Sequence, residues 1–232
     1  MPVIAESSLV RGILTPARAA RASVPPSAAA GPPPAPHDVA HFMSLEEALH
    51  RRRSVRTFTA EPVSAAELDL IVRSGLAAER TGWPPGRHPA MGVTIAVAAY
   101  AVSGIEPGLY LPEPTSGAFS ARPRDEGLLA GLSAQYTIAP VLLLVCGNLT
   151  QACAAFGQRG YPQLLVRAGA AGYGAWLAAV AAGLSGCAYG RTNHRVTVAV
   201  RQHGVPQRGG GSLRHLFTVA VGRTPTEDTN DL

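Results

Sequence analysis

The amino-acid sequence predicts an α+β domain in which helices and strands pack in layers around one core. Two observations lead to this prediction. Two capped helices open the domain and are followed by strands that alternate with helices, and 47% of the residues are hydrophobic while only 15% are charged. This composition supplies enough apolar surface for a core and differs from that of disordered chains. The length of 232 residues fits one domain with a tail.

The first 42 residues differ in composition from the rest of the chain. Residues 24–36 read VPPSAAAGPPPAP and show neither helical nor strand periodicity. We therefore predict that residues 1–42 are a tail or wrapping arm, that 43–223 form the globular domain and that 224–232 are a short tail. The start of the chain lacks an uninterrupted apolar signal core, and the three cysteines form no CxxC pair, which together indicate a cytoplasmic protein.

Two capping boxes mark the start of the domain. Ser44 precedes Glu47 by three residues, and Ser64 precedes Glu67 by the same spacing. In such a box the serine hydroxyl accepts a hydrogen bond from the glutamate N–H, and the glutamate carboxylate accepts one from the serine N–H. We expect a helix after each serine and an extended connection at 56–63, which contains a proline.

Apolar runs predict the strands, and one long segment predicts a central helix. Residues 162–183 carry proline in the first turn and glycine at the end, and they are dense in small residues. Such residues suit a helix in close contact with others, while Arg167 and Gln163 argue against a membrane span. A short helix is expected at 128–132 and an irregular loop at 80–88. The expected strands are 93–102, 108–111, 140–146 and 215–221.

The sharpest local feature is the run RRRSVR at residues 51–56, where the first helix is expected to end. Several guanidinium groups and a hydroxyl can bind a phosphate there through charge-assisted, bidentate hydrogen bonds. A solvated cationic helix end is an equally good interpretation from the residues alone. A nucleic-acid patch is less favoured, because no interleaved aromatic residues accompany the run. The net charge of +5 suits an anionic ligand or partner.

All 20 basic residues are arginines, which restricts the chemistry. Schiff-base chemistry and a P-loop both need a lysine and are excluded. A general acid or base must therefore be His, Tyr, Cys, Asp or Glu. The spacing of His194, His203 and His215 fits no zinc pattern, so no metal site is expected.

Four stretches in order resemble the nitroreductase family. Residues 44–70 are similar to its opening, in which a first helix ends in Arg-Arg-Ser-x-Arg-x-Phe. Residues 104–111 (GIEPGLYL) resemble a strand of the SagB-type dehydrogenases, a branch of that family. Residues 165–190 resemble its long central helix and the glycine-rich loop after it, and 215–223 resemble its closing strand.

The resemblance implies a layered fold with a central, mainly antiparallel sheet flanked by helices. It also implies a homodimer that binds FMN at the subunit interface, with no role for nucleic acid or a membrane. The residues that it assigns to FMN are Arg52, Arg53, Ser54 and Arg56 at the phosphate and ribityl chain, and Gly92, Ala188, Tyr189 and Gly190 at the ring.

The sequence also departs from the family pattern. The central helix usually reads like Glu-Ala-Gly-His-x-x-Gln-Asn, whereas here the polar positions are largely replaced, beginning with Arg167. SagB-type azoline oxidases often carry a Lys-Tyr pair before this helix, where this chain has Gln-Arg-Gly-Tyr. Tyr161 is therefore the first candidate for the catalytic base and Tyr173 the second. Arg159 is the cation that would help a phenol ionise.

The function implied is that of an FMN-dependent dehydrogenase. It would oxidise thiazolines or oxazolines in a ribosomally made precursor peptide to azoles, beside a cyclodehydratase. Three alternatives stay open: an NAD(P)H-dependent nitroreductase or quinone reductase of small molecules, a flavin-binding subunit that scaffolds a complex without catalysis, and a nucleic-acid-binding protein.

Overall fold

The computed structural model describes residues 43–112, 119–122, 125–202 and 213–225. The chain divides at Pro36 into two units, and every described residue belongs to the second, His37–Leu232. The predicted arm at 1–42 lies outside the described residues, as does most of the predicted tail at 224–232.

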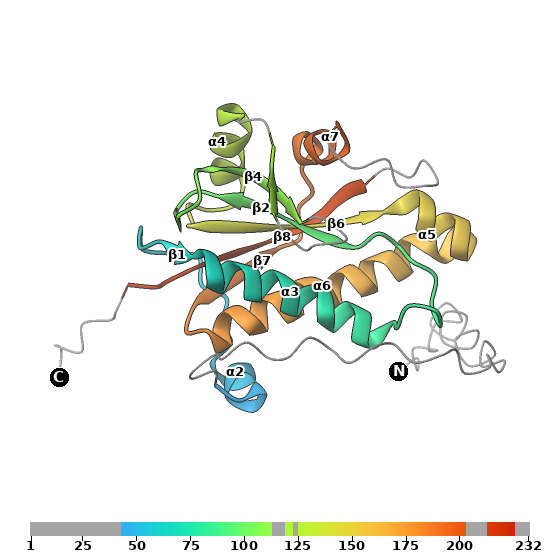
Figure 1. The fold of residues 1–232 in the computed structure, drawn as a ribbon, viewed down its shortest axis with the longest axis horizontal. Helices are drawn as coiled ribbons and strands as arrows, with labels where there is room; N and C mark the ends of the chain where they lie inside the picture. Colours follow the sequence, from blue (N-terminus) through green and yellow to red (C-terminus); the bar gives the residue numbers. More distant parts are fainter. Residues whose placement is uncertain (1–42, 113–118, 123–124, 203–212, 226–232) are drawn as a thin grey trace, which may run out of the picture. The chain divides into compact units, whose positions relative to one another are not determined.

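A six-stranded sheet forms the centre of the described domain, in the order β5-β4-β2-β6-β8-β7 (Figure 1). Every neighbouring pair of strands in it is antiparallel. A separate parallel pair joins β1 (Val63–Ser64) and β3 (Val102–Ser103). The strands of the main sheet are β2 (Thr94–Ala99), β4 (Gly108–Pro112), β5 (Phe119–Ala121), β6 (Val141–Asn148), β7 (Ser185–Tyr189) and β8 (Leu213–Gly222).

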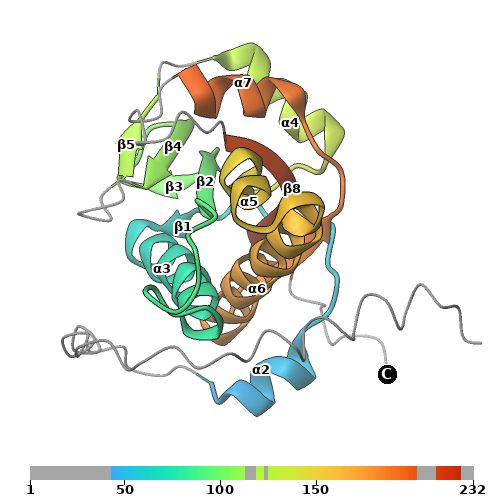
Figure 2. The same cartoon turned by 90° about the vertical axis from the view of Figure 1, so that its right-hand side faces the viewer.

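Helices cover both faces of this sheet (Figures 1 and 2). Helices α3 and α6 pack on one face, and α4 and α7 lie on the other. Alternate residues of β6 therefore enter two hydrophobic clusters: Leu143 faces α3 and α6, and Leu144 faces α4 and α7. This double coverage explains why all eight residues of β6 are buried. The helices are α2 (Leu45–Arg51), α3 (Ala65–Gly82), α4 (Glu126–Gln135), α5 (Leu149–Phe156), α6 (Gly160–Ala181) and α7 (His194–Gln202), with a 3₁₀ turn at Gly157–Arg159.

Helices α3 and α6 approach each other closely because glycine lies at their crossing. A Cβ atom on Gly75 would lie 2.5 Å from the carbonyl oxygen of Ala171 and 2.8 Å from the Cβ of Ala175. The stretch Leu149–Ala181 is long and apolar enough to cross a membrane by length and composition. Its 18-residue apolar window has a mean hydropathy of 1.4, and half of that window is buried inside the fold. Helix α6 is thus the central helix of the domain core.

The predicted fold class is confirmed, and so are both capped helices and the four predicted strands. At Ser64 the capping box is reciprocal. At Ser44 the predicted reciprocal box is wrong in part. The hydroxyl accepts from the Glu47 N–H at 3.1 Å, but the Glu47 carboxylate pairs with Arg51 at 2.7 Å. Helix α6 ends just before Gly183, whose φ of 78° suits the glycine predicted at the helix end.

Two predicted loops are wrong in part. Helix α3 continues through Gly82, so the irregular loop begins at Trp83 and not at residue 80. The glycine-rich segment after α6 is not all loop, because Ser185–Tyr189 pairs along β8 as strand β7. The sequence does not predict this strand because residues 185–188 are small. The strand is stabilised by pairing with β8 and not by a run of branched side chains.

Candidate functional site

The arginine-rich segment lies where α2 ends and the chain begins to run beside β7. Arg52 is the C-cap residue of α2. Beyond it, Ser54 forms a parallel bridge with Gly186, and the Val55 N–H donates to the Gly186 carbonyl at 3.0 Å. Side chains of extended backbone alternate between two sides, so Arg52, Ser54 and Arg56 share one side of the segment.

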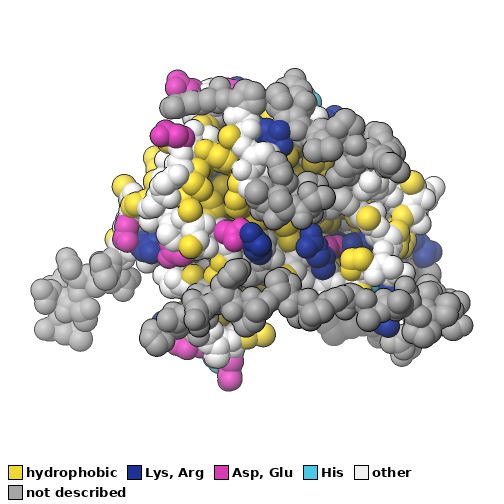
Figure 3. All heavy atoms as spheres, in the orientation of Figure 1, with side chains coloured by type: hydrophobic (Ala, Val, Ile, Leu, Met, Phe, Trp, Pro, Cys, Tyr) yellow, Lys and Arg dark blue, Asp and Glu magenta, His cyan; other side chains and the backbone are white. Residues whose placement is uncertain are grey.

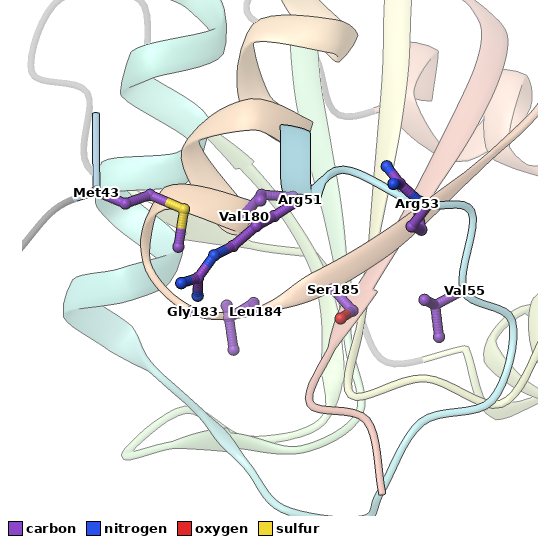
Figure 4. Close-up of a pocket in the computed structure, with 8 residues that line it drawn as sticks. All are labelled: Met43, Arg51, Arg53, Val55, Val180, Gly183, Leu184 and Ser185. Atoms are coloured by element: carbon purple, nitrogen blue, oxygen red, sulfur yellow. The ribbon is translucent and has the colours of Figure 1, made fainter. Parts of the chain in front are cut away.

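The other side of the segment lines a small cavity of about 180 Å³ (Figure 4). Arg53 lines it but also donates to the carbonyl oxygens of His50 at 2.7 Å and Arg52 at 3.0 Å, which caps the end of α2. Arg51 lines it and pairs with Glu47. Both cations near this cavity therefore already have partners. The lining residues are Met43, Arg51, Arg53, Val55, Val180, Gly183, Leu184 and Ser185.

Aromatic side chains of α6 hold Arg52 in place. The Arg52 guanidinium lies over the Trp176 ring, 4.9 Å from its centroid. Tyr173 meets the same indole edge-on, with 6.2 Å between centroids. Stacking of this kind uses the face of the guanidinium and leaves its N–H groups unoccupied by the ring. Arg52 can therefore still donate hydrogen bonds to an anion. Ser54 and Arg56 are exposed on the same side.

The outer edge of β7 presents backbone groups beside this segment. The Gly186 carbonyl points away from β8, since it accepts from Val55. In an antiparallel pair this direction repeats every second residue, so the N–H and C=O of Ala188 also point off the sheet edge. Ala188 is exposed and Gly190 follows it. The Tyr189 side chain instead turns to the α4 side, where its ring lies 5.7 Å from that of Tyr136.

The remaining predicted site residues lie elsewhere in the fold. Tyr161 is the second residue of α6 and is 48% exposed, while Tyr173 is 43% exposed. Tyr173 lies twelve positions after Tyr161, which corresponds to about 18 Å along the helix axis. Arg159 lies two residues before Tyr161 and is exposed. Gly92, with a φ of 56°, leads into β2, which is separated from β7 by two strands.

The structure therefore divides the predicted site residues into two groups. The first group, near the C-terminal half of α6, consists of the arginine segment, Tyr173 and the β7 edge. The second group, Gly92, Arg159 and Tyr161, lies toward the other end of α6 and of the sheet. Within one chain the two groups do not meet.

The sequence profile of the nitroreductase family matches residues 49–223, which is most of the chain and includes both groups. The chain belongs to the nitroreductase family. Members of this family are flavin-dependent oxidoreductases, and the flavin is typically FMN. The nitroreductase-type protein MJ1384 of Methanocaldococcus jannaschii is 30% identical over 156 residues, which cover 61% of this chain and 76% of that one.

Solved structures share the fold of this nitroreductase-family chain. A nitroreductase-type structure from Anabaena variabilis has a TM-score of 0.60 at 21% identity and covers 78% of this chain, which spans only 38% of that protein. One from Ralstonia eutropha has a TM-score of 0.60 at 19% identity, with 82% and 88% coverage. The E. coli microcin synthetase McbBCD complex with truncated pro-MccB17 bound has a TM-score of 0.58 at 15% identity, with 97% and 85% coverage.

Buried titratable groups of this nitroreductase-family domain are structural. Burial lowers the pKa of His215 to about 4, and its Nδ1 accepts from the Asn193 N–H at 2.9 Å. Burial raises the pKa of the Cys146 thiol to about 12, as suits a core residue. Among the residues that the structure describes, no three His, Cys, Asp or Glu side chains gather as a metal site would require.

One interaction of the site could not be found from sequence spacing. Arg167 of α6 forms a buried ion pair with Glu79 of α3, although 88 residues separate them in the chain. The sequence singled out Arg167 only as a departure from the family pattern. Its partner becomes evident only when the two helices are packed.

Proposed function

We propose that this nitroreductase-family protein is an FMN-dependent dehydrogenase that oxidises thiazolines or oxazolines of a ribosomally made peptide to azoles. The observation that supports the cofactor best is the placement of Arg52, Ser54 and Arg56 on one side of the segment that runs along the β7 edge. Cationic donors and outward backbone groups thus lie side by side over a short distance.

The donor set fits the two ends of FMN. Two guanidinium groups and a hydroxyl suit the phosphate and the ribityl chain. The outward N–H and C=O of Ala188, followed by Tyr189 and Gly190, offer a backbone donor and acceptor to the imide edge of the ring. Arg53 already caps α2, so we expect it to contribute least of the arginines. When bound, FMN would supply the acceptor for a hydride from the substrate.

A homodimer would complete the site. The outer face of α6 exposes Leu165, Val166 and Tyr173. On the same helix, no atom of the described residues lies within 4 Å of a Cβ built at Gly169. A two-fold axis through this face sets two α6 helices antiparallel, so opposite ends meet. Gly92 and Tyr161 of the partner subunit would then lie beside the arginine segment of the first subunit. This arrangement places the cofactor between subunits.

Aromatisation of an azoline requires loss of a ring proton as well as a hydride. Tyr161 is our first candidate to accept that proton, and Tyr173 is the second. Arg159, two residues before Tyr161 in the chain, is the third residue that we propose to act at this step. The gain from forming an aromatic ring makes a weak base sufficient, so a lysine is not required.

The peptide substrate is supported by one of the fold relatives. The E. coli structure contains a truncated pro-peptide bound to a synthetase complex, and its fold similarity covers 97% of this chain. The net charge of +5 suits an acidic leader peptide or an acidic partner such as a cyclodehydratase. An NAD(P)H-dependent reductase of small molecules is the second candidate, favoured by family membership alone.

The decisive experiment combines cofactor analysis with a peptide assay. We expect the purified protein to bind FMN and to convert an azoline peptide to the azole, seen by mass spectrometry as loss of two hydrogens. Rapid bleaching of the bound flavin by NAD(P)H without azoline oxidation would support the small-molecule reductase. Flavin binding without either activity would support a scaffold subunit. A colourless protein that binds DNA in a salt-sensitive manner would refute the flavoenzyme.

Arginine variants test the placement of the cofactor. We expect Arg52→Gln and Arg56→Gln each to weaken FMN binding by roughly tenfold or more, since a charge-assisted hydrogen bond contributes about 1.5–3 kcal/mol. Arg53→Gln is the matched control and should weaken it less. Fluorescence quenching of titrated FMN measures all three. A larger loss for Arg53→Gln than for Arg52→Gln would contradict the placement.

Tyrosine variants test the proton acceptor. Tyr161→Phe should lower the rate of azoline oxidation at least tenfold and leave FMN binding within about twofold, because general-base catalysis typically contributes 10²–10⁴ in rate. Tyr173→Phe, which keeps the ring against Trp176, should have a smaller effect. Full activity of Tyr161→Phe would remove Tyr161 as the base.

A further inference from the structure

We propose that Arg167 is a positioning residue that fixes the loop between α3 and β2, and through it the conformation of Gly92 at the flavin. This inference rests on the proposed function, because Gly92 is assigned to the flavin only there. It explains why an arginine occupies the centre of a buried helix interface.

Arg167 contacts three separate parts of the fold at once. Its Nε donates to Glu79 Oε1 of α3 at 2.5 Å, and its Nη2 pairs with the same carboxylate. Its Nη1 donates to the Pro89 carbonyl at 2.7 Å. The Cζ atom of the guanidinium also lies over the Trp83 ring, 5.7 Å from its centroid. Arg167 is 5% exposed and Glu79 is 7% exposed, so the pair is shielded from water.

The loop that Arg167 holds is anchored at both ends and turned in the middle. Trp83 is the C-cap residue of α3, and the N–H groups of Arg87 and His88 both donate to the Pro84 carbonyl at 3.2 Å. Beyond Pro89, the Met91 carbonyl accepts from the Asn148 N–H at 2.9 Å.

Gly92 lies directly after this second anchor, with a left-handed φ of 56°. The Pro89 tether from Arg167 therefore lies three residues before Gly92. Without that tether, the approach of the chain to Gly92 would depend on the Met91 anchor, which consists of its carbonyl bond and its buried side chain.

Holding the loop in this way requires the planar, forked guanidinium of an arginine. A guanidinium can bind a carboxylate and a carbonyl in fixed directions at once, whereas an ammonium is a point charge. Arg167→Lys would keep the charge opposite Glu79 but would not reach Glu79, Pro89 and the Trp83 ring in the same geometry. The loop would then sample other conformations, and apparent ligand affinity falls by the fraction of competent conformers.

The test compares loop order with cofactor affinity in the full-length protein. We expect Arg167→Lys to speed amide hydrogen exchange at Arg87, His88 and Gly92 and to raise the Kd for FMN about tenfold, if the competent loop population falls to roughly one tenth. The double variant Glu79→Met with Arg167→Met avoids an unpaired buried charge and should show the same two effects with a folded core. The surface pair Asp69 and Arg73 on α3, replaced by Asn and Gln, is the control and should change neither quantity.

The outcomes separate this inference from the proposed function. Unchanged exchange in the loop would overturn the tether, whatever the cofactor does. Faster exchange with unchanged FMN affinity would overturn the link to the flavin. Failure of the wild-type protein to bind FMN would overturn both the proposed function and the link between Arg167 and the flavin. The exchange measurement would still test whether Arg167 holds the loop.

Discussion

His215 shows how one buried side chain fastens a helix to the sheet. It lies on β8 and is 2% exposed. Its N–H donates to Thr197 Oγ1 at 3.1 Å, and its Nδ1 accepts from the N–H of Asn193, next to the first residue of α7. An accepting Nδ1 requires that this nitrogen carry no proton, and Nε2 can then donate to Thr218 Oγ1 at 3.0 Å. The neutral ring is the form that fits the fold.

We expect the free energy of unfolding to fall as the pH is lowered from about 6.5 toward 4. In this window the imidazole is protonated in the unfolded chain but neutral in the folded one, because burial lowers its folded pKa to about 4. The contribution is complete above the unfolded pKa and lost below the folded one, and amounts to roughly 3 kcal/mol. Urea unfolding across this pH range measures it.

The matched variants for this prediction are His215→Gln and His88→Gln. The first removes the titrating ring from the core and should flatten the pH dependence between 6.5 and 4. His88 is exposed, so its replacement should leave the dependence as it is. An unchanged slope in His215→Gln would contradict the assignment.

At the residue scale, the sequence predicted the arginine segment but not the roles within it. The run RRRSVR indicated an anion site, yet its spacing did not show that Arg53 would turn back to the α2 carbonyls. The pairing of Arg167 with Glu79 depends on how two helices cross, and no local pattern encodes that contact.

At the scale of elements, the crossing of α3 and α6 sets the shape of the core. A side chain at Gly75 would collide with backbone and side-chain atoms of α6 and with Ile95 of β2. Gly174 contributes from the α6 side, where a Cβ would lie 2.6 Å from that of Ala78. Two helices with small residues at the contact can thus lie close enough to share one face of the sheet.

We expect Gly75→Ala to lower the free energy of unfolding by about 2 kcal/mol, as overpacking of a core typically costs 1–3 kcal/mol. Gly82→Ala is the control on the same helix, because a Cβ there meets no atom within 4 Å in the part of the chain that the structure describes. It should leave stability unchanged or raise it by less than about 1 kcal/mol. Thermal and urea unfolding of both variants measure the difference. Equal stability of the two would show that α6 shifts freely to make room.

Elements with their own strong pattern were predictable, and elements that depend on neighbours were not. The apolar run of β6 and the capping box of α3 identify a strand and a helix without any tertiary information. Strand β7 has small residues at 185–188 and is stabilised by pairing with β8. Helix α7 buries Val196 and Val200 in the cluster that it shares with β8 and α4. These two residues form an apolar stripe that is too narrow to predict a helix from the sequence.

At the scale of the whole molecule, the division of the site into two groups argues for a dimer. One chain brings Arg52 to Trp176 but leaves Tyr161 at the far end of α6. A protein in which these groups act together needs a second copy, and the exposed apolar face of α6 lies between them. The family resemblance predicts the dimer, and the separation of the two groups along α6 is the observation that favours it.

We expect the wild-type protein to be a dimer by light scattering and Val166→Glu to be a monomer that binds FMN at least tenfold more weakly. Val166 is 57% exposed on α6, and a charge there would be buried in the interface. Ala130→Glu on the exposed side of α4, across the sheet, is the control and should leave both properties unchanged. A monomeric wild-type protein with full FMN affinity would contradict the two-subunit site.

The outer edge of β7 also bears on solubility. An uncovered strand edge is a template on which another chain can add a strand, and proteins usually block such edges. Val55 covers Gly186. At Ala188 the carbonyl accepts a weak hydrogen bond from Cys187 Sγ at 3.6 Å, and the N–H points off the same sheet edge. A flavin ring bound along that edge would block the addition of another strand. The amount of flavin available during synthesis would then set the fraction of the protein that stays soluble, in addition to the fraction that carries the cofactor.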